Sequence, residues 1–117
     1  VVLDVGANIG LFTLHLRRDM KSWAAPSPRC ITAQSGVTVF AFEPLPPNYD
    51  ALRRNLREHN ITSTESTSAP LSQTSDRFCV MACPYGVSAE SNPQVNFTFF
   101  PNMSGNSCIS AEEKVIR

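Results

Sequence analysis

Two carboxylates, Asp4 and Glu43, stand within or directly after short apolar segments of the sequence, at residues 1–5 (VVLDV) and 37–42 (VTVFAF). Both segments have the continuous, β-branched character of strands that are buried on both faces. A carboxylate at the end of the second strand can accept hydrogen bonds from both hydroxyls of a ribose, and it would repel a 2′-phosphate. Together the two acids predict a nucleoside ligand with a free ribose.

The chain between these strands begins with a glycine-containing turn, residues 4–10 (DVGANIG), followed by an amphipathic helix over residues 9–18. Gly6 allows the chain to turn and a ligand to approach the backbone, and Gly10 lets the helix pack close to the strand. The first N–H groups of the helix, which Asn8 begins, would face that ligand. A dinucleotide fold more often shows G-x-G-x-x-G, and Asn8 fills the place of its middle glycine. A nicotinamide-dependent dehydrogenase is therefore the weaker interpretation.

Helical and strand patterns alternate along the next part of the chain. Residues 46–60 have apolar side chains at helical spacing, with Pro47 suited to the first turn and Asn60 to a left-handed end. Residues 78–83 (FCVMAC) predict a third strand, and residues 95–100 (VNFTFF) a fourth that is antiparallel or at an edge. Such alternation predicts a parallel sheet covered on both faces, with ligands bound beyond the carboxyl ends of the strands.

Composition limits the classes of partner. The 117 residues make at most one small domain, and ten Lys plus Arg balance ten Asp plus Glu. This balance gives no field that would gather nucleic acid or an anionic membrane, so neither partner is expected. No apolar run approaches the ~20 residues of a membrane span, and the first residues are a core strand rather than a signal peptide. We expect a soluble, cytoplasmic protein, with its oligomeric state left open.

The cysteines and histidines do not form a metal-binding pattern. Cys79 and Cys83 lie in one apolar run, so they are interpreted as buried thiols rather than as half of a disulfide framework. No second matching pair accompanies them, and His15 and His59 have no neighbour at ligand spacing, so no metal is expected. The glycosylation sequon, which matters only in a secreted chain, has three matches that we treat as chance, at Asn60, Asn96 and Asn102.

Two segments have the composition of surface insertions. Residues 20–36 contain two prolines and separate the first helix from the second strand. Residues 62–76 carry nine Ser or Thr in fifteen positions and follow neither the helical nor the strand period. Both are expected to be mobile parts of one domain over residues 1–117, and the second is not expected to contribute to the core.

Two linked motifs extend this interpretation. The turn D-x-G-A-N-x-G and the later segment F-E-P-x-P-x-N-Y-x-x-L-x-x-N-L resemble the FkbM family of S-adenosylmethionine-dependent methyltransferases, over residues 1–18 and 37–60. Residues 95–107 (VNFTFFPNMSGNS) are similar to a later region of that family. The resemblance implies a Rossmann-like class I methyltransferase fold, which is α/β with a doubly wound, mostly parallel sheet. It also implies methyl transfer to a hydroxyl of a small metabolite, a sugar or a carrier-bound intermediate.

The resemblance assigns binding roles residue by residue. Glu43, with Pro44 beside it, would hold the ribose of S-adenosylmethionine. The turn after the third strand, which includes Val87 and Ser88, would face the adenine, although the acidic residue that the family usually shows next is displaced here to Glu90. The methionine end of the cofactor would be lined by Asp4, Gly6, Ala7, Asn8 and Gly10.

No catalytic residue is assigned, because the seven-stranded sheet of the family extends past this chain. In the family the fourth main strand carries a K-x-D-x-E-G-type segment beside the transferred methyl group, and no such segment occurs here. We therefore expect the cofactor-binding half of a methyltransferase, with residues 1–5 as a central strand that has one bare flank. Alone, such a half is expected to be inactive and only marginally stable.

Simpler roles stay open for several of these residues. Asp4 could cap the turn or bind backbone N–H groups, and Glu43 could be a solvated strand end made rigid by Pro44. Tyr49 and Asn55 are interpreted as helix packing and local hydrogen bonding rather than as cofactor contacts. For the whole chain, the alternative to an enzyme is a truncated, non-catalytic protein that binds nucleoside weakly or only interacts with partners.

Overall fold

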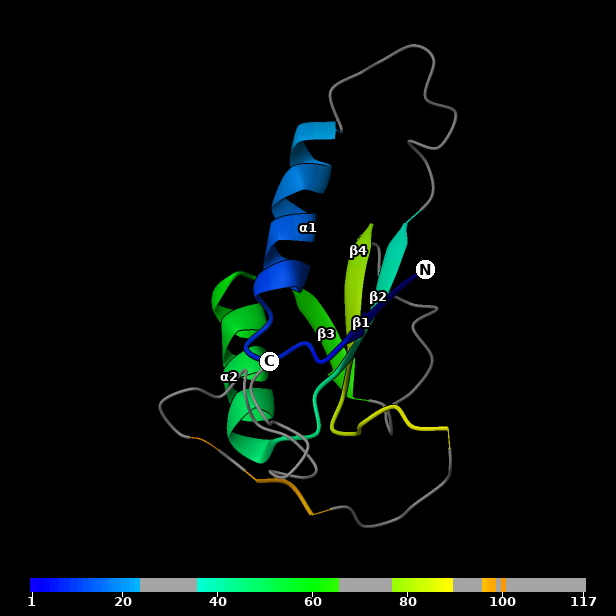
Figure 1. Ribbon diagram of the computed structural model, residues 1–117. Coiled ribbons are helices and arrows are strands. Elements are labelled where there is room, and N and C mark those ends of the chain that lie inside the picture. Colours follow the sequence, from blue (N-terminus) through cyan, green and yellow to red (C-terminus); the bar gives the residue numbers. More distant parts are fainter. Residues whose placement is uncertain (24–35, 66–76, 90–95, 99, 101–117) are drawn as a thin grey trace, which may run out of the picture. The chain divides into compact units, whose positions relative to one another are not determined.

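The computed structural model describes residues 1–23, 36–65, 77–89, 96–98 and 100. The chain divides into two compact units, residues 1–86 and 87–117, and every helix and strand below belongs to the first. In chain order the elements are β1 (Val2–Val5), α1 (Leu11–Trp23), β2 (Val37–Phe42), α2 (Pro46–Glu58), β3 (Thr62–Glu65) and β4 (Phe78–Cys83) (Figure 1).

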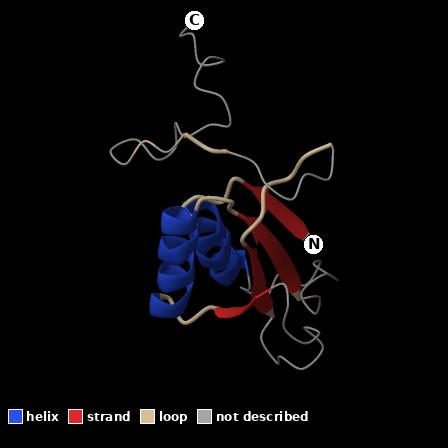
Figure 2. Cartoon of the chain, turned by 90° about the horizontal axis from the view of Figure 1, so that it is seen from below, coloured by secondary structure: helices blue, strands red, loops and turns tan. Residues whose placement is uncertain are grey.

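The four strands form one parallel sheet in the order β1-β2-β4-β3. Parallel neighbours require crossover connections, and α1 supplies the crossover between β1 and β2. Both helices lie on the same side of the sheet (Figure 2). The predicted α/β class with a parallel sheet is thus confirmed, but among the described residues the helices cover one face of the sheet and not both as predicted. The carboxyl ends of all four strands lie at the same end of the sheet.

The core lies between the helices and the face of the sheet that they cover. Val39 on β2 pairs in register with Val80 on β4, and neither side chain is exposed. Leu52 and Leu56 of α2 belong to the same buried cluster and are also completely buried. Burial of each leucine contributes ~1.5–3 kcal/mol, so α2 is held to the sheet mainly by this apolar stripe.

Helix α2 has the expected boundaries at both ends. Pro46 begins the helix, where its missing N–H removes no intrahelical hydrogen bond. At the other end Asn60 adopts a left-handed φ of 51°, and the Ile61 N–H donates to the Leu56 carbonyl at 2.9 Å. This closure is the one predicted for Asn60, and it directs the chain into β3.

Helix α1 is shifted and longer than the predicted helix over residues 9–18. Asn8 and Gly10 have left-handed φ values of 52° and 88°, so the helix begins only after them, at Leu11. It continues to Trp23 because no helix-breaking residue occurs before Pro26. The first residues of the segment predicted as an insertion, 20–36, are therefore helical, and residues 24–35 lie outside the described residues.

The Ser/Thr-rich segment at residues 62–76 also begins with regular structure, so the expectation of a loop is wrong for its first four residues. Thr62–Glu65 form β3, which pairs with β4 at the edge of the sheet. Ser and Thr are typical of solvated loops, but Thr is also β-branched and suits an edge strand whose side chains are half-buried or exposed. Residues 66–76 lie outside the described part of the chain.

The strand predicted over residues 95–100 is only partly described. In its described residues, 96–98 and 100, a single β-bridge occurs at Thr98, and the sheet contains no strand from this segment. Phe100 is 39% exposed. Alternation of apolar and polar residues over six positions therefore did not produce an extended strand in the described part.

Candidate functional site

The turn between β1 and α1 has a backbone that only a few residue types adopt easily. Gly6, Asn8 and Gly10 all have positive φ values, of 79°, 52° and 88°. Glycine enters this region without steric cost, and asparagine does so more readily than most other residues. The N–H groups of Gly6 and Ala7 both donate to the carbonyl of Phe42 at 2.9 Å, which holds the turn against the end of β2.

The two glycines of this turn have different surroundings. A Cβ added at Gly6 would meet no heavy atom within 4 Å, so the space beside this residue is open, as a ligand approach requires. A Cβ added at Gly10 would lie 2.6 Å from Leu52 Cδ1 on α2. Gly10 was predicted to allow close packing of its own helix on the strand. The close neighbour is instead the second helix, because α1 begins one residue later and α2 lies beside the turn.

Glu43, at the end of β2, connects the two turns at the carboxyl edge of the sheet. Its Oε2 accepts the Asn8 N–H at 2.8 Å, and its Oε1 accepts the Leu45 N–H at 2.9 Å. The side chain is only 4% exposed, so the simpler hypothesis of a solvated strand end is wrong. Each carboxylate oxygen has two lone-pair directions, so each keeps one acceptor position after these bonds are made.

Asp4, on β1, is buried beside the first turn of α1. Thr13 Oγ1 donates to Asp4 Oδ2 at 2.7 Å, and the Thr13 side chain is completely buried. The hydrogen bond that Asp4 accepts thus comes from a side chain and not from the backbone N–H groups of the turn, as the simpler hypothesis suggested. This contact fixes α1 against β1. Thr13 was missed in the sequence because it was counted as an ordinary residue of the amphipathic helix. Its polar side chain among the apolar positions of that helix was the available signal.

Helix α2 supports the turn from the other side. Asn55 Nδ2 donates to the Ile9 carbonyl at 2.8 Å, and Tyr49 donates its hydroxyl to the Ala82 carbonyl at 3.3 Å. Burial raises the pKa of Tyr49, and the nearby Glu65 carboxylate adds to this effect. Both side chains therefore make packing and hydrogen-bond contacts within the protein, but the prediction of local bonding is wrong, because the partners are 46 and 33 positions away along the chain.

The turn after β4 approaches the same edge. The Glu43 N–H donates to the Cys83 carbonyl at 3.0 Å, and a Cβ added at Gly86 would lie 3.8 Å from Pro44 Cβ. The turns after β1, β2 and β4 are thus held together within the first unit, around Glu43. Val87 and Ser88, predicted to face an adenine, are exposed and belong to the second unit.

The cysteines in the described residues behave as predicted. Cys79 and Cys83 are buried, free thiols, and burial raises the pKa of the Cys83 thiol. A thiol with a raised pKa stays protonated at neutral pH and is a poor nucleophile.

Across the described ranges, no group of three or more His, Cys, Asp or Glu side chains could hold a metal ion. Within the same ranges, none of the helices has the length and apolar character needed to cross a membrane.

Three curated proteins are similar in sequence to this chain. Methyltransferase 1 of Beauveria bassiana (strain ARSEF 2860) is 28% identical over 113 residues, which are 97% of this chain and 33% of the relative. Methyltransferase sdnD of Sordaria araneosa is 32% identical over 113 residues, covering 97% of this chain and 32% of the relative. The 31-O-demethyl-FK506 methyltransferase FkbM of Streptomyces tacrolimicus is 41% identical over 61 residues, covering 52% of this chain and 18% of the relative.

The chain is thus similar in sequence to methyltransferases, and FkbM is one of them. The family resemblance stated from the two motifs is therefore confirmed, and the parallel α/β sheet agrees with a Rossmann-like methyltransferase fold. The chain spans about a third of the length of the first two relatives. No family model matches the sequence, and no solved structure matches it significantly.

Proposed function

We propose that this chain binds S-adenosylmethionine at the carboxyl edge of its sheet and supplies the cofactor-binding half of a methyltransferase. The observation that carries the proposal is the buried Glu43 carboxylate, held by N–H groups from two turns. A carboxylate fixed in this way needs no rearrangement to accept further hydrogen bonds, so its free lone pairs are ready for the two hydroxyls of a ribose.

The surrounding residues fit the remainder of such a cofactor. Gly6 leaves open space next to the backbone, and the first N–H groups of α1, at residues 11–13, have no partner within the helix. These N–H groups, at the positive end of the helix dipole, favour a carboxylate such as that of the methionine moiety. Asp4 keeps its second oxygen available for an ammonium group, because Thr13 occupies only Oδ2.

When bound, S-adenosylmethionine would supply a methyl group on a sulfonium, which a positioned nucleophile attacks in line with the leaving sulfur. The contribution of this chain is to hold and orient the donor through the turn, Glu43 and Pro44. Val87 and Ser88 are proposed to face the adenine. No residue of the chain is assigned to the acceptor or to proton removal.

The acceptor is proposed to be a hydroxyl of a small metabolite, a sugar or a carrier-bound intermediate. The name of one relative, 31-O-demethyl-FK506 methyltransferase, describes methylation of an oxygen on a small molecule, which supports this class for the present chain. The relatives are about three times as long as the chain, so residues that bind the acceptor are proposed to come from the rest of the methyltransferase.

Calorimetric titration with S-adenosylhomocysteine tests the role of Glu43. Glu43→Ala should weaken binding by ~1.5–3 kcal/mol, the range for hydrogen bonds to a charged group. Glu43→Gln, which keeps the side-chain shape, serves as a second variant in case the alanine protein is unstable. Glu58→Ala is the matched control, because Glu58 is an exposed carboxylate at the end of α2.

Two results would contradict the proposal. The first is unchanged affinity in a Glu43 variant whose circular dichroism shows a folded protein, which would remove the ribose role. The second is binding of NAD in preference to S-adenosylhomocysteine by the wild-type protein, which would favour the dehydrogenase interpretation.

A further inference from the structure

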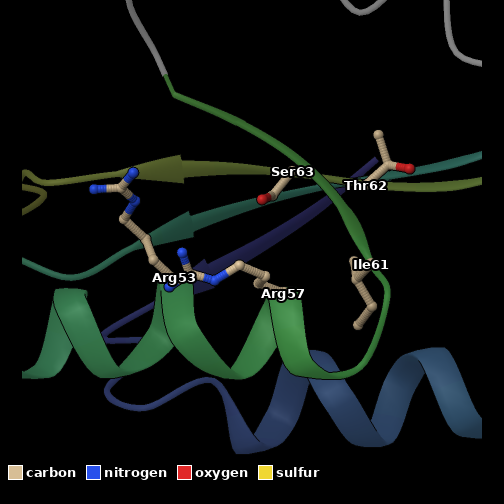
Figure 3. Close-up of a pocket in the computed structure, with 5 residues that line it drawn as sticks. All are labelled: Arg53, Arg57, Ile61, Thr62 and Ser63. Carbon is tan, nitrogen blue, oxygen red and sulfur yellow. The ribbon is translucent and has the colours of Figure 1, made fainter.

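A second candidate site lies near the amino ends of the strands, at the end of the sheet opposite Glu43. A cavity of about 370 Å³ is lined by Arg53 and Arg57 of α2 and by Ile61, Thr62 and Ser63, where the chain enters β3 (Figure 3). Thr62 is the first residue of β3, so the cavity lies toward the amino ends of the parallel strands. Glu43 stands at their carboxyl ends, and the two sites therefore share no residue.

The two arginines are arranged by the helix. Residues four apart lie on the same face of an α-helix, so Arg53 and Arg57 both leave α2 on the side of β3. Figure 3 shows the Arg57 side chain running back toward Arg53, as expected for side chains that lean toward the start of a helix. The Ser63 side chain is directed toward the helix, and that of Thr62 lies on the other side of the strand (Figure 3).

The charges in this cavity do not balance. Arg53 Nη2 lies 2.6 Å from Glu65 Oε1, and its guanidinium stacks over Tyr49 with 5.8 Å to the ring centroid. Among the described residues no carboxylate lies within ion-pair distance of Arg57. One carboxylate thus faces two guanidinium groups, which leaves one net positive charge. The C-terminal end of the helix dipole attracts the Arg57 cation but does not supply a discrete anion.

The donors in the cavity match a phosphate group better than a carboxylate. A carboxylate pairs well with a single guanidinium, and the Glu65 carboxylate on β3 already makes one such contact with Arg53. A phosphate monoester has three terminal oxygens and a charge near −2, which suits two guanidinium groups and a hydroxyl donor such as Ser63. The volume exceeds that of a free phosphate ion, so there is room for part of the esterified molecule.

We propose that Arg53, Arg57 and Ser63 form a binding site for the phosphate group of a small phosphate monoester. Arg57 supplies the unpaired charge, Arg53 is held in place by its contacts with Glu65 and Tyr49, and Ser63 donates from the edge strand. This site is independent of the proposed methyl-donor site, because it lies at the amino ends of the strands and the methyl-donor site lies at their carboxyl ends.

The test is a titration of the ¹⁵N-labelled protein with inorganic phosphate, followed by NMR at constant ionic strength. The expected result is saturable shifts of the Ile61, Thr62 and Ser63 amides. Arg57→Gln should weaken this binding at least about tenfold, the loss expected for one charged hydrogen bond. Arg54→Gln removes the same charge from the neighbouring exposed position outside the cavity, and it should change the affinity less than about twofold.

Parallel titrations define what would overturn the proposal. Phosphate shifts that stay linear, or that are equal in the Arg57→Gln and Arg54→Gln proteins, would show only non-specific attraction. Acetate that saturates the same amides as tightly as phosphate would overturn the assignment to a phosphate group. Arg57→Gln should leave the affinity for S-adenosylhomocysteine unchanged. Loss of phosphate binding tests the phosphate site, and loss of S-adenosylhomocysteine binding tests the cofactor site, so the two proposals can fail separately.

Discussion

Strands β1 and β4 are both short apolar runs, and they differ sharply in burial. In β4, five of six residues are buried, whereas in β1 only Asp4 is buried and Leu3 and Val5 are 65% and 60% exposed. β4 lies between β2 and β3, while in the described residues β1 pairs with β2 alone. The difference shows that burial depends on the neighbours of a strand as much as on its composition.

The turn after β1 is nevertheless closely packed against α2 at Gly10, and Gly10→Ala should show this with the largest effect. The new Cβ would lie 2.6 Å from Leu52 Cδ1, and alanine at a φ of 88° is strained. We expect a loss of ~2–4 kcal/mol in the free energy of unfolding, from overpacking and backbone strain together. Urea denaturation of Gly10→Ala and Gly6→Ala is the measurement. Gly6→Ala has open space and should lose only ~1–2 kcal/mol for its left-handed backbone.

Truncation of one residue in each strand tests the comparison directly. Val80→Ala removes two methyl groups from a site with no exposure, and should cost ~2 kcal/mol through lost burial and a new cavity. Leu3→Ala removes a larger but exposed side chain, and should change stability by less than ~0.5 kcal/mol. Equal losses in thermal or urea unfolding would mean that the outer face of β1 is covered in solution.

A smaller loss than at Gly10 or Val80 is expected at the buried hydrogen bond that ties β1 to α1. Thr13→Val keeps the side-chain shape but leaves Asp4 Oδ2 without its donor, which should cost ~1–2 kcal/mol. Thr13→Ser, which retains the hydroxyl, is the control and should recover part of this loss. A Thr13→Val protein as stable as the wild type would show that the Asp4–Thr13 contact contributes nothing to holding the exposed strand.

The sequence predicted those parts of the fold that depend on local patterns. Tyr49, Leu52 and Leu56 recur at helical spacing, and Asn60 tolerates a left-handed φ, so α2 was located almost to the residue. β3 was missed because its residues are polar. What makes Thr62–Glu65 a strand is the hydrogen-bonding edge of β4, which no local pattern records.

Individual residues of the candidate site were predicted, but the contacts that join them were not. Asp4, Gly6 and Glu43 were selected by residue type at strand ends, and the structure brings the turns that contain them together. The role of Leu52 beside Gly10 could not be predicted, because it depends on the depth at which α2 packs. Likewise, Arg53 and Arg57 face Ser63 only because β3 exists.

The contact between Asn55 and the Ile9 carbonyl bears on the order of folding. It joins residues 46 positions apart, and the Asn8–Glu43 contact spans 35, so both must wait for the closure of long loops. During synthesis, the segment of residues 4–10 would leave the ribosome well before the helix that holds it. We expect its amides to gain protection in pulse-labelled hydrogen exchange only together with those of α2, so that this turn is among the last parts of the first unit to become ordered.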